Sequence, residues 1–144
     1  MKPLISETNS SFKWFILATA TFVTMLYAMN VTIASIALSD MRGAMGATQD
    51  QISWVVTGNI VATAIFTPFA GWLSSRVQIR TILIFSVLGF IISSIFCGMS
   101  NSLEEIVFFR VAQGVFGAPL PPLSQTLVLA AFPKRQISLA MAVW

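Results

Sequence analysis

Long apolar runs alternate with short polar stretches along the whole sequence. The long runs cover about residues 14–38, 52–73, 81–98 and 106–132, and a shorter one occupies residues 136–144. A helix rises about 1.5 Å per residue, so roughly 20 residues cross a hydrocarbon core about 30 Å thick. Lipid supplies no hydrogen-bond partner for an open strand edge, which favours helices. The pattern therefore predicts an all-α, polytopic transmembrane helix bundle with four spans and the start of a fifth helix.

Residues at the ends of the runs carry helix-boundary chemistry. Thr48 with Gln51, and Ser102 with Glu105, have the spacing of a capping box, in which each side chain bonds to the other residue's backbone N–H. Pro133 follows the fourth run and cannot continue a helix. These signals predict helices that begin just after Thr48 and Ser102, and one that ends at Pro133.

The composition agrees with a membrane protein and excludes several functions. Hydrophobic residues make up 56% of the chain and charged residues 9%, whereas a soluble domain has roughly 25% charged residues. The chain has no His and a single cysteine, Cys97, and its five acidic residues lie in the expected tail and loops. We therefore predict no metal site, no cofactor and no enzyme active site. The basic residues are mostly spread over the loops, so a nucleic-acid partner is not expected.

The charges of the loops differ in sign and set an orientation. The tail and the second and fourth loops are basic, the third loop is acidic and the first is mixed: Lys2, Lys13, Arg76, Arg80, Lys134 and Arg135 against Glu104 and Glu105, with Asp40, Arg42 and Asp50 in the first loop. By the positive-inside rule, residues 1–12 form a cytoplasmic polar tail and residues 13–144 a transmembrane region. A cleaved signal peptide is the alternative for the first run, whose roughly 25 apolar residues exceed the usual apolar region of about 7–15.

Arg110 lies inside the fourth run, where a charge costs at least about 2.5 kcal/mol and is rarely without purpose. At about 100° per residue, it shares one helix side with amides, a hydroxyl and glycines: Gln113, Gly114, Gly117, Pro121, Ser124 and Gln125. We interpret this stripe as the lining of a cavity, with glycines that also let a neighbouring helix approach. Two alternatives stay open: Arg110 snorkels to a nearby interface, or the stripe serves helix packing alone.

Three prolines interrupt the same run. Pro119, Pro121 and Pro122 remove backbone donors, which predicts a kink midway along the helix. Carbonyls freed at this depth are tolerated only against protein or a wet cavity.

Asn30 is a polar residue within the first run. It groups with Tyr27, Ala34 and Ala37 on a small, polar face suited to a neighbouring helix. Two interpretations stay open, a residue of a transport cavity and an amide that only holds two helices together. The second run carries a similar polar line of Asn59, Thr63 and Thr67. No Asp or Glu lies inside any of the four runs, so the sequence contains no carboxylate proton carrier within them.

Four stretches resemble motifs of one family. They are MNVTIASIAL at Met29–Leu38, QISWVVTGNIVATAI at Gln51–Ile65, GWLSSRVQIR at Gly71–Arg80 and FFRVAQGVFGAPLPPLSQTLVL at Phe108–Leu129. In this order they resemble the first helix, the second helix, the loop between helices 2 and 3, and the fourth helix of the major facilitator superfamily. More narrowly, the chain is similar to the fourteen-helix drug:proton antiporters of the EmrB/QacA type.

The resemblance implies a fold, a function and partners. The fold is the first four helices, plus the start of a fifth, of a major facilitator N-terminal half. The function is proton-coupled efflux of hydrophobic or amphipathic compounds across a bacterial inner membrane. The implied partners are the lipid bilayer, a small hydrophobic substrate, protons, the remainder of the transporter's own chain, a periplasmic adaptor and an outer-membrane channel. By resemblance, Arg110 has a role in proton coupling, and Gly71 and Arg76 act in a conformational loop. To these we add Gln113 and Asn30 as candidates for proton coupling or the cavity, and Arg80 as a candidate of the loop.

The chain departs from the family's motifs at several positions. Asn30 stands where the family usually has Asp, and an amide does not titrate, which argues against proton coupling through the first helix. Ser75 replaces the Asp of the loop motif and offers no charge to an Arg or a helix end, which weakens a conformational latch there. Ser39, Gln78 and Ile79 also differ from the motifs.

Two other functions compete with this interpretation. A complete four-helix exporter that works as an oligomer needs a membrane carboxylate, which these runs lack. A non-transporting membrane subunit, or an inactive truncated fragment, would pack its polar stripe without water. We expect the chain to be the N-terminal part of a longer transporter.

Overall fold

The computed structural model of the chain describes residues 10–46, 48–133 and 135–144. All regular elements in this part are helices: α1 (Ser10–Met45), α2 (Gln49–Ser74), α3 (Ile79–Met99), α4 (Leu103–Gly117), α5 (Leu120–Ala131) and α6 (Ile137–Val143). Four stretches there are long and apolar enough to cross a membrane, namely Phe12–Ala37, Gln49–Ser74, Ile79–Met99 and Leu103–Ala131. The prediction of an all-α, polytopic bundle is confirmed. The tail residues 1–9, Lys134 and the side chains of Asp40 and Arg42 lie outside what the structure describes.

α1 is longer than the first apolar run. It begins at Ser10 and continues to Met45, whereas the sequence predicted a polar tail up to residue 12 and a loop after residue 38. Gly46 follows it with a φ of 60°, the left-handed conformation that commonly closes a helix and that glycine adopts without steric penalty. The polar residues after residue 38 therefore did not end the helix, and α1 continues as far as Gly46.

The helix starts largely follow the predicted caps. Thr48 Oγ1 accepts from the Gln51 backbone N–H at 3.4 Å and Gln51 Oε1 accepts from the Thr48 N–H at 3.0 Å, which completes the capping box of α2. Ser102 Oγ accepts from the Glu105 N–H at 3.3 Å, but the Glu105 carboxylate bonds to the Asn101 N–H at 3.0 Å. The second predicted box is therefore only half formed, because the carboxylate reaches one residue further back.

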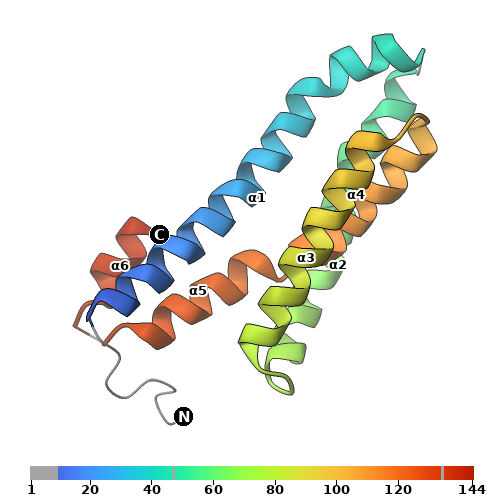
Figure 1. The fold of residues 1–144 in the computed structure, drawn as a ribbon. Helices are drawn as coiled ribbons and strands as arrows, with labels where there is room; N and C mark the ends of the chain where they lie inside the picture. The colour runs from blue at the N-terminus through green and yellow to red at the C-terminus, as the bar shows by residue number, and fades with distance from the viewer. Residues whose placement is uncertain (1–9, 47, 134) are drawn as a thin grey trace.

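The fourth apolar run folds as two helices. The sequence predicted one kinked helix over residues 106–132, but the helix is interrupted at Ala118 and Pro119. Pro119, Pro121 and Pro122 lack the N–H groups that would bond to carbonyls four residues earlier. α4 packs with α2 and α3, whereas α5 turns away from that group and packs against α1 (Figure 1).

Two apolar clusters hold these parts together. One joins α1, α5 and α6 through Leu17, Ala20, Val128, Ala131, Phe132 and Ala140, with Trp14 edge-on to the Phe132 ring at 5.8 Å between centroids. The other joins α2 and α4 through Ile52, Val55 and Ile106. Large apolar side chains are nevertheless exposed on the helices, Phe85 and Phe108 among them. This distribution suits segments whose outer surface faces lipid or further protein.

Candidate functional site

A network of hydrogen bonds centred on Arg110 links three helices. Arg110 Nη1 on α4 donates to Asn30 Oδ1 on α1 and to Gln113 Oε1, both at 2.9 Å. Gln113 Nε2 in turn donates to Ser94 Oγ on α3 at 2.5 Å. Gln113 is 1% exposed, and the other three side chains are half-buried. The structure thus brings together Arg110, Gln113 and Asn30, three residues that the sequence singled out separately, and adds Ser94, which the sequence analysis missed.

The guanidinium has neutral partners in the part of the chain that the structure describes. Its two acceptors are amide oxygens, and its Nε–H is buried without a hydrogen-bond partner among the described residues. The described carboxylates, Asp50, Glu104 and Glu105, stand in the first turns of α2 and α4. A partly buried cation without a counter-charge is energetically costly, and its unused donor can accept a further partner.

α2 holds the backbone of α4 next to this network. Asn59 Nδ2 donates to the Arg110 carbonyl oxygen at 3.0 Å, and Asn59 is 6% exposed. Thr63 Oγ1 lies 2.9 Å from the Asn59 carbonyl oxygen and 3.4 Å from that of Gly114, so its single hydroxyl hydrogen is shared. The sequence signal for these contacts was the polar line on the second helix, which carried no information about its partner.

Glycines make the contact between α2 and α4 close. A Cβ on Gly114 would lie 2.5 Å from the Asn59 carbonyl oxygen and 2.9 Å from Ala62 Cβ. A Cβ on Gly117 would lie 2.7 Å from the ring of Tyr27 on α1. A larger residue at either position would therefore push a neighbouring helix away.

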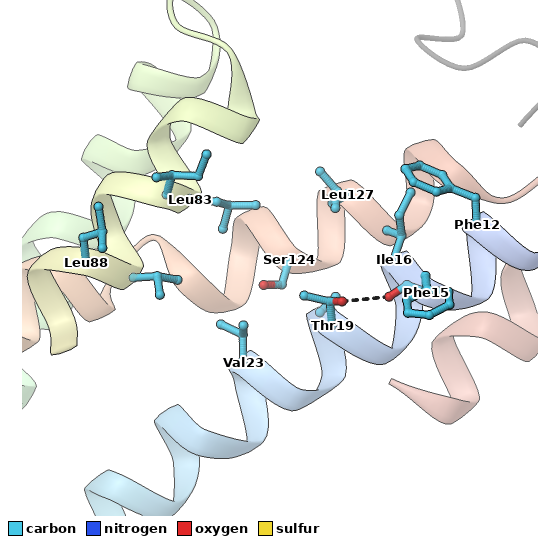
Figure 2. Close-up of a pocket in the computed structure, with 12 residues that line it drawn as sticks. Phe12, Phe15, Ile16, Thr19, Val23, Leu83, Leu88, Ser124 and Leu127 are labelled. Carbon is cyan, nitrogen blue, oxygen red and sulfur yellow. Dashed lines mark hydrogen bonds between the residues drawn. The ribbon is translucent and has the colours of Figure 1, made fainter.

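The predicted polar stripe is divided between two surroundings. Arg110 and Gln113 face the network, whereas Ser124, on α5 and 2% exposed, lines an apolar groove of about 780 Å³ between α1, α3 and α5 (Figure 2). Thr19 also lines the groove, but its hydroxyl donates to its own helix at the Phe15 carbonyl, 2.9 Å away (Figure 2). The expectation of one continuous stripe was wrong, because the break at residues 118–119 turns α5 toward other neighbours.

The residues of the expected conformational loop lie apart from the Arg110 network. Gly71 is in the last turns of α2, and no described atom outside its local backbone lies within 4 Å of a Cβ built there. The Arg76 guanidinium carbon lies 4.7 Å from the centre of the Trp72 ring, a cation–π distance. Arg80 is exposed in the first turn of α3. The remaining predicted positions, Pro119, Pro121 and Pro122, mark the break between α4 and α5.

Comparison with known proteins supports the motif resemblance. "Multidrug export protein EmrB" of Escherichia coli (strain K12) is 41% identical over 121 residues, which are 84% of this chain and 24% of that protein. "Probable multidrug resistance protein EmrY" of the same strain is 35% identical over 91% of this chain and 26% of its own length. "Fatty acid resistance protein FarB" of Neisseria gonorrhoeae is 37% identical over 81% of this chain and 23% of its own length.

The chain spans about a quarter of the length of these relatives. The profile of the family described as Major Facilitator Superfamily matches residues 20–144, a range that runs from within α1 through α6. This match covers most of the sequence and includes parts of all four candidate spans. The chain belongs to the major facilitator superfamily and is a multi-pass membrane segment.

Proposed function

We propose that this chain is part of a transporter that exports hydrophobic or amphipathic compounds in exchange for protons. The observation that carries the proposal is the Arg110 guanidinium, which lies in a membrane span and bonds to neutral amide oxygens. Charged residues in such positions commonly mark substrate or proton pathways. The names of the relatives, which refer to multidrug export and to fatty acid resistance, support a hydrophobic or amphipathic substrate and a transport role instead of an enzymatic one.

The coupling role of Arg110 follows from electrostatics. A fixed positive charge favours the ionised form of a carboxylate within about 4–6 Å, and so promotes the release of its proton. The four candidate spans contain no Asp or Glu deeper than their first turn, so the proton-carrying group would come from the remainder of the transporter. Arg110 would pair with that group when the group is ionised. When the group is protonated, Arg110 would bond to Asn30 and Gln113 instead. The two transporter halves would rock about a site near the bilayer midplane. One pairing would then occur when the site opens to one side of the membrane, and the other when it opens to the opposite side.

The orientation and partners form the second half of the proposal. The N-terminal end of α1, the α2–α3 connection and the α5–α6 connection lie toward one end of the helices (Figure 1). They carry Lys13, Arg76 and Arg135, which supports a cytoplasmic location for this end in a bacterial inner membrane. Gly71, Arg76 and Arg80 would act in a conformational loop on the same side. By similarity to EmrB, a periplasmic adaptor and an outer-membrane channel would continue the export path.

The experiment that tests this function is Arg110→Ala in the full-length transporter. Efflux of a fluorescent amphipathic dye from loaded proteoliposomes is measured with and without a pH gradient. We expect gradient-driven efflux to fall by about 100-fold, which corresponds to about 2.7 kcal/mol of lost stabilisation. Arg135→Lys, which changes an exposed arginine outside the spans and keeps the positive charge at that end, is the control. Unchanged efflux in Arg110→Ala at equal reconstitution would eliminate the coupling role.

A further inference from the structure

Two side-chain donors on α2 are in register with two carbonyl acceptors on α4. Asn59 and Thr63 are four residues apart, and so are Arg110 and Gly114, whose carbonyl oxygens accept from them at 3.0 and 3.4 Å. Four residues are about one helical turn, so both bonds fall on the same side of each helix. The Gly114 carbonyl keeps its helical bond from the Ala118 N–H at 2.9 Å. The α2 side chains therefore add to the helix of α4 without replacing its own bonds.

This pairing tolerates little displacement. Sliding α4 by one residue would move both carbonyls by about 1.5 Å and bring to their height residues that lie about 100° away around the helix, so neither side chain would keep its acceptor. The gap lined by Asn59, Arg110 and residues of α1 and α2 is too narrow to hold a water molecule. A displaced Asn59 amide would therefore have no water in this gap as a replacement acceptor. The contact is thus selective for one register of α4 on α2.

The acceptor nearest to the network belongs to Arg110 itself. Its carbonyl bonds to Asn59 on α2, while its guanidinium bonds to Asn30 on α1 and Gln113 on α4. Fixing the carbonyl fixes the height and rotation at which the long side chain leaves α4. We propose that Asn59 is a positioning residue for Arg110, with Thr63 as its secondary support. This inference rests on the proposed function of Arg110 in coupling.

The test uses Asn59→Leu, which keeps the number and branching of the side-chain heavy atoms and removes the donor. In the full-length transporter carrying Cys97→Ser, Ile65 on α2 and Phe108 on α4 are each replaced by cysteine and spin-labelled. The side chains of Ile65 and Phe108 are 61% and 68% exposed. Pulsed electron paramagnetic resonance then reports the distance between the two helices, and proteoliposome efflux reports transport. Thr67→Val is the matched control, because Thr67 Oγ1 bonds to the Thr63 carbonyl of its own helix at 2.7 Å.

We expect Asn59→Leu to shift or broaden the label distance by about 1.5 Å or more, one residue's rise, and Thr67→Val to leave it unchanged. Gradient-driven efflux should fall by about tenfold in Asn59→Leu and stay within about twofold in the control. Asn59→Ser, which restores a shorter donor, should recover part of both readouts. An unchanged distance in Asn59→Leu overturns the positioning role whatever the efflux, and so does a shifted distance with full efflux.

The failure of this inference differs from the failure of the proposed function. Arg110→Lys keeps the backbone carbonyl that Asn59 binds, so its label distance should match that of the parent protein. Full efflux in Arg110→Lys and Arg110→Ala would refute the coupling role of Arg110. The label distances would still show whether Asn59 sets the register of α4 on α2. Lost efflux in both Arg110 variants, with normal efflux in Asn59→Leu, would leave coupling intact and refute positioning.

Discussion

Arg110 and Asn30 stand 80 positions apart in the sequence and meet through a 2.9 Å hydrogen bond from the guanidinium to the amide oxygen. The contact joins the first and fourth candidate spans within the membrane. A neutral acceptor binds the cation without cancelling its charge, so Arg110 remains electrostatically available to a titrating group brought near it. Replacing the amide by a carboxylate would remove that availability.

Asn30→Asp should therefore make transport depend on pH in a new way. At neutral pH the added carboxylate is ionised beside the guanidinium, and this ion pair in a partly buried site holds Arg110 more strongly than the neutral amide oxygen does. Acid protonates the carboxylate and restores a neutral partner. We expect efflux to be slowed by about tenfold at neutral pH and to recover toward the parent rate as pH falls. A pH profile of efflux, with Asn30→Ser as the uncharged control, checks this; identical profiles would make Asn30 purely structural.

Gly114→Ala should separate α2 from α4. The added Cβ would lie 2.5 Å from a backbone oxygen of Asn59, which cannot move without its helix. Overpacking of this kind costs about 1–3 kcal/mol, and we expect a lower thermal midpoint of the purified transporter by several degrees. Gly98→Ala on α3 is the control, since no described atom outside its local backbone lies within 4 Å of its Cβ. Equal midpoints for the two variants would contradict the close contact.

Gln113→Leu should break the connection between α4 and α3. The buried Gln113 amide accepts from the Arg110 guanidinium and donates to the Ser94 hydroxyl. Its removal leaves the guanidinium N–H and the hydroxyl oxygen without this partner. Loss of such bonds costs about 1–3 kcal/mol. Because both residues belong to one network, adding Ser94→Ala should cost little more, which a double-mutant cycle of thermal unfolding measures. Additive effects of the two substitutions would show that they act independently.

Cysteine labelling should distinguish the two parts of the predicted stripe. In a Cys97→Ser background, Asn30→Cys should react with a charged, membrane-impermeant thiol reagent when the transporter opens. Ser124→Cys lies in an apolar groove and should react only with a permeant, apolar reagent. Labelling rates measured with and without substrate test this. Complete protection of Asn30→Cys in every condition would favour a non-transporting subunit with a dry interior.

The sequence predicted the spans, the α2 cap and the shared helix face of Arg110 and Gln113, because each depends on residues close together in the chain. Hydropathy over about 20 residues locates a span, and the spacing of Arg110 and Gln113 puts their side chains on one helix face. The same local rules failed where tertiary contacts decide. The proline segment predicted a kink but not its direction, and so the division of the stripe could not be foreseen. The polar line of α2 did not reveal that Asn59 binds a backbone carbonyl, since such an acceptor has no sequence signature.

The separation of α5 from α4 also sets the order in which the segment can assemble. α2, α3 and α4 follow one another and pack together, whereas α1 finds its main partner in α5 and shares an apolar cluster with Ala140 on α6 (Figure 1). The ribosome therefore delivers α1 before α2, α3 and α4, and its main partner α5 only after them. We expect newly made α1 to remain attached to the insertion machinery until α5 emerges, which photo-crosslinking of stalled nascent chains can follow. Release of α1 from the insertion machinery before α5 has been synthesised would mean that packing against α2 is enough to hold α1 in the membrane.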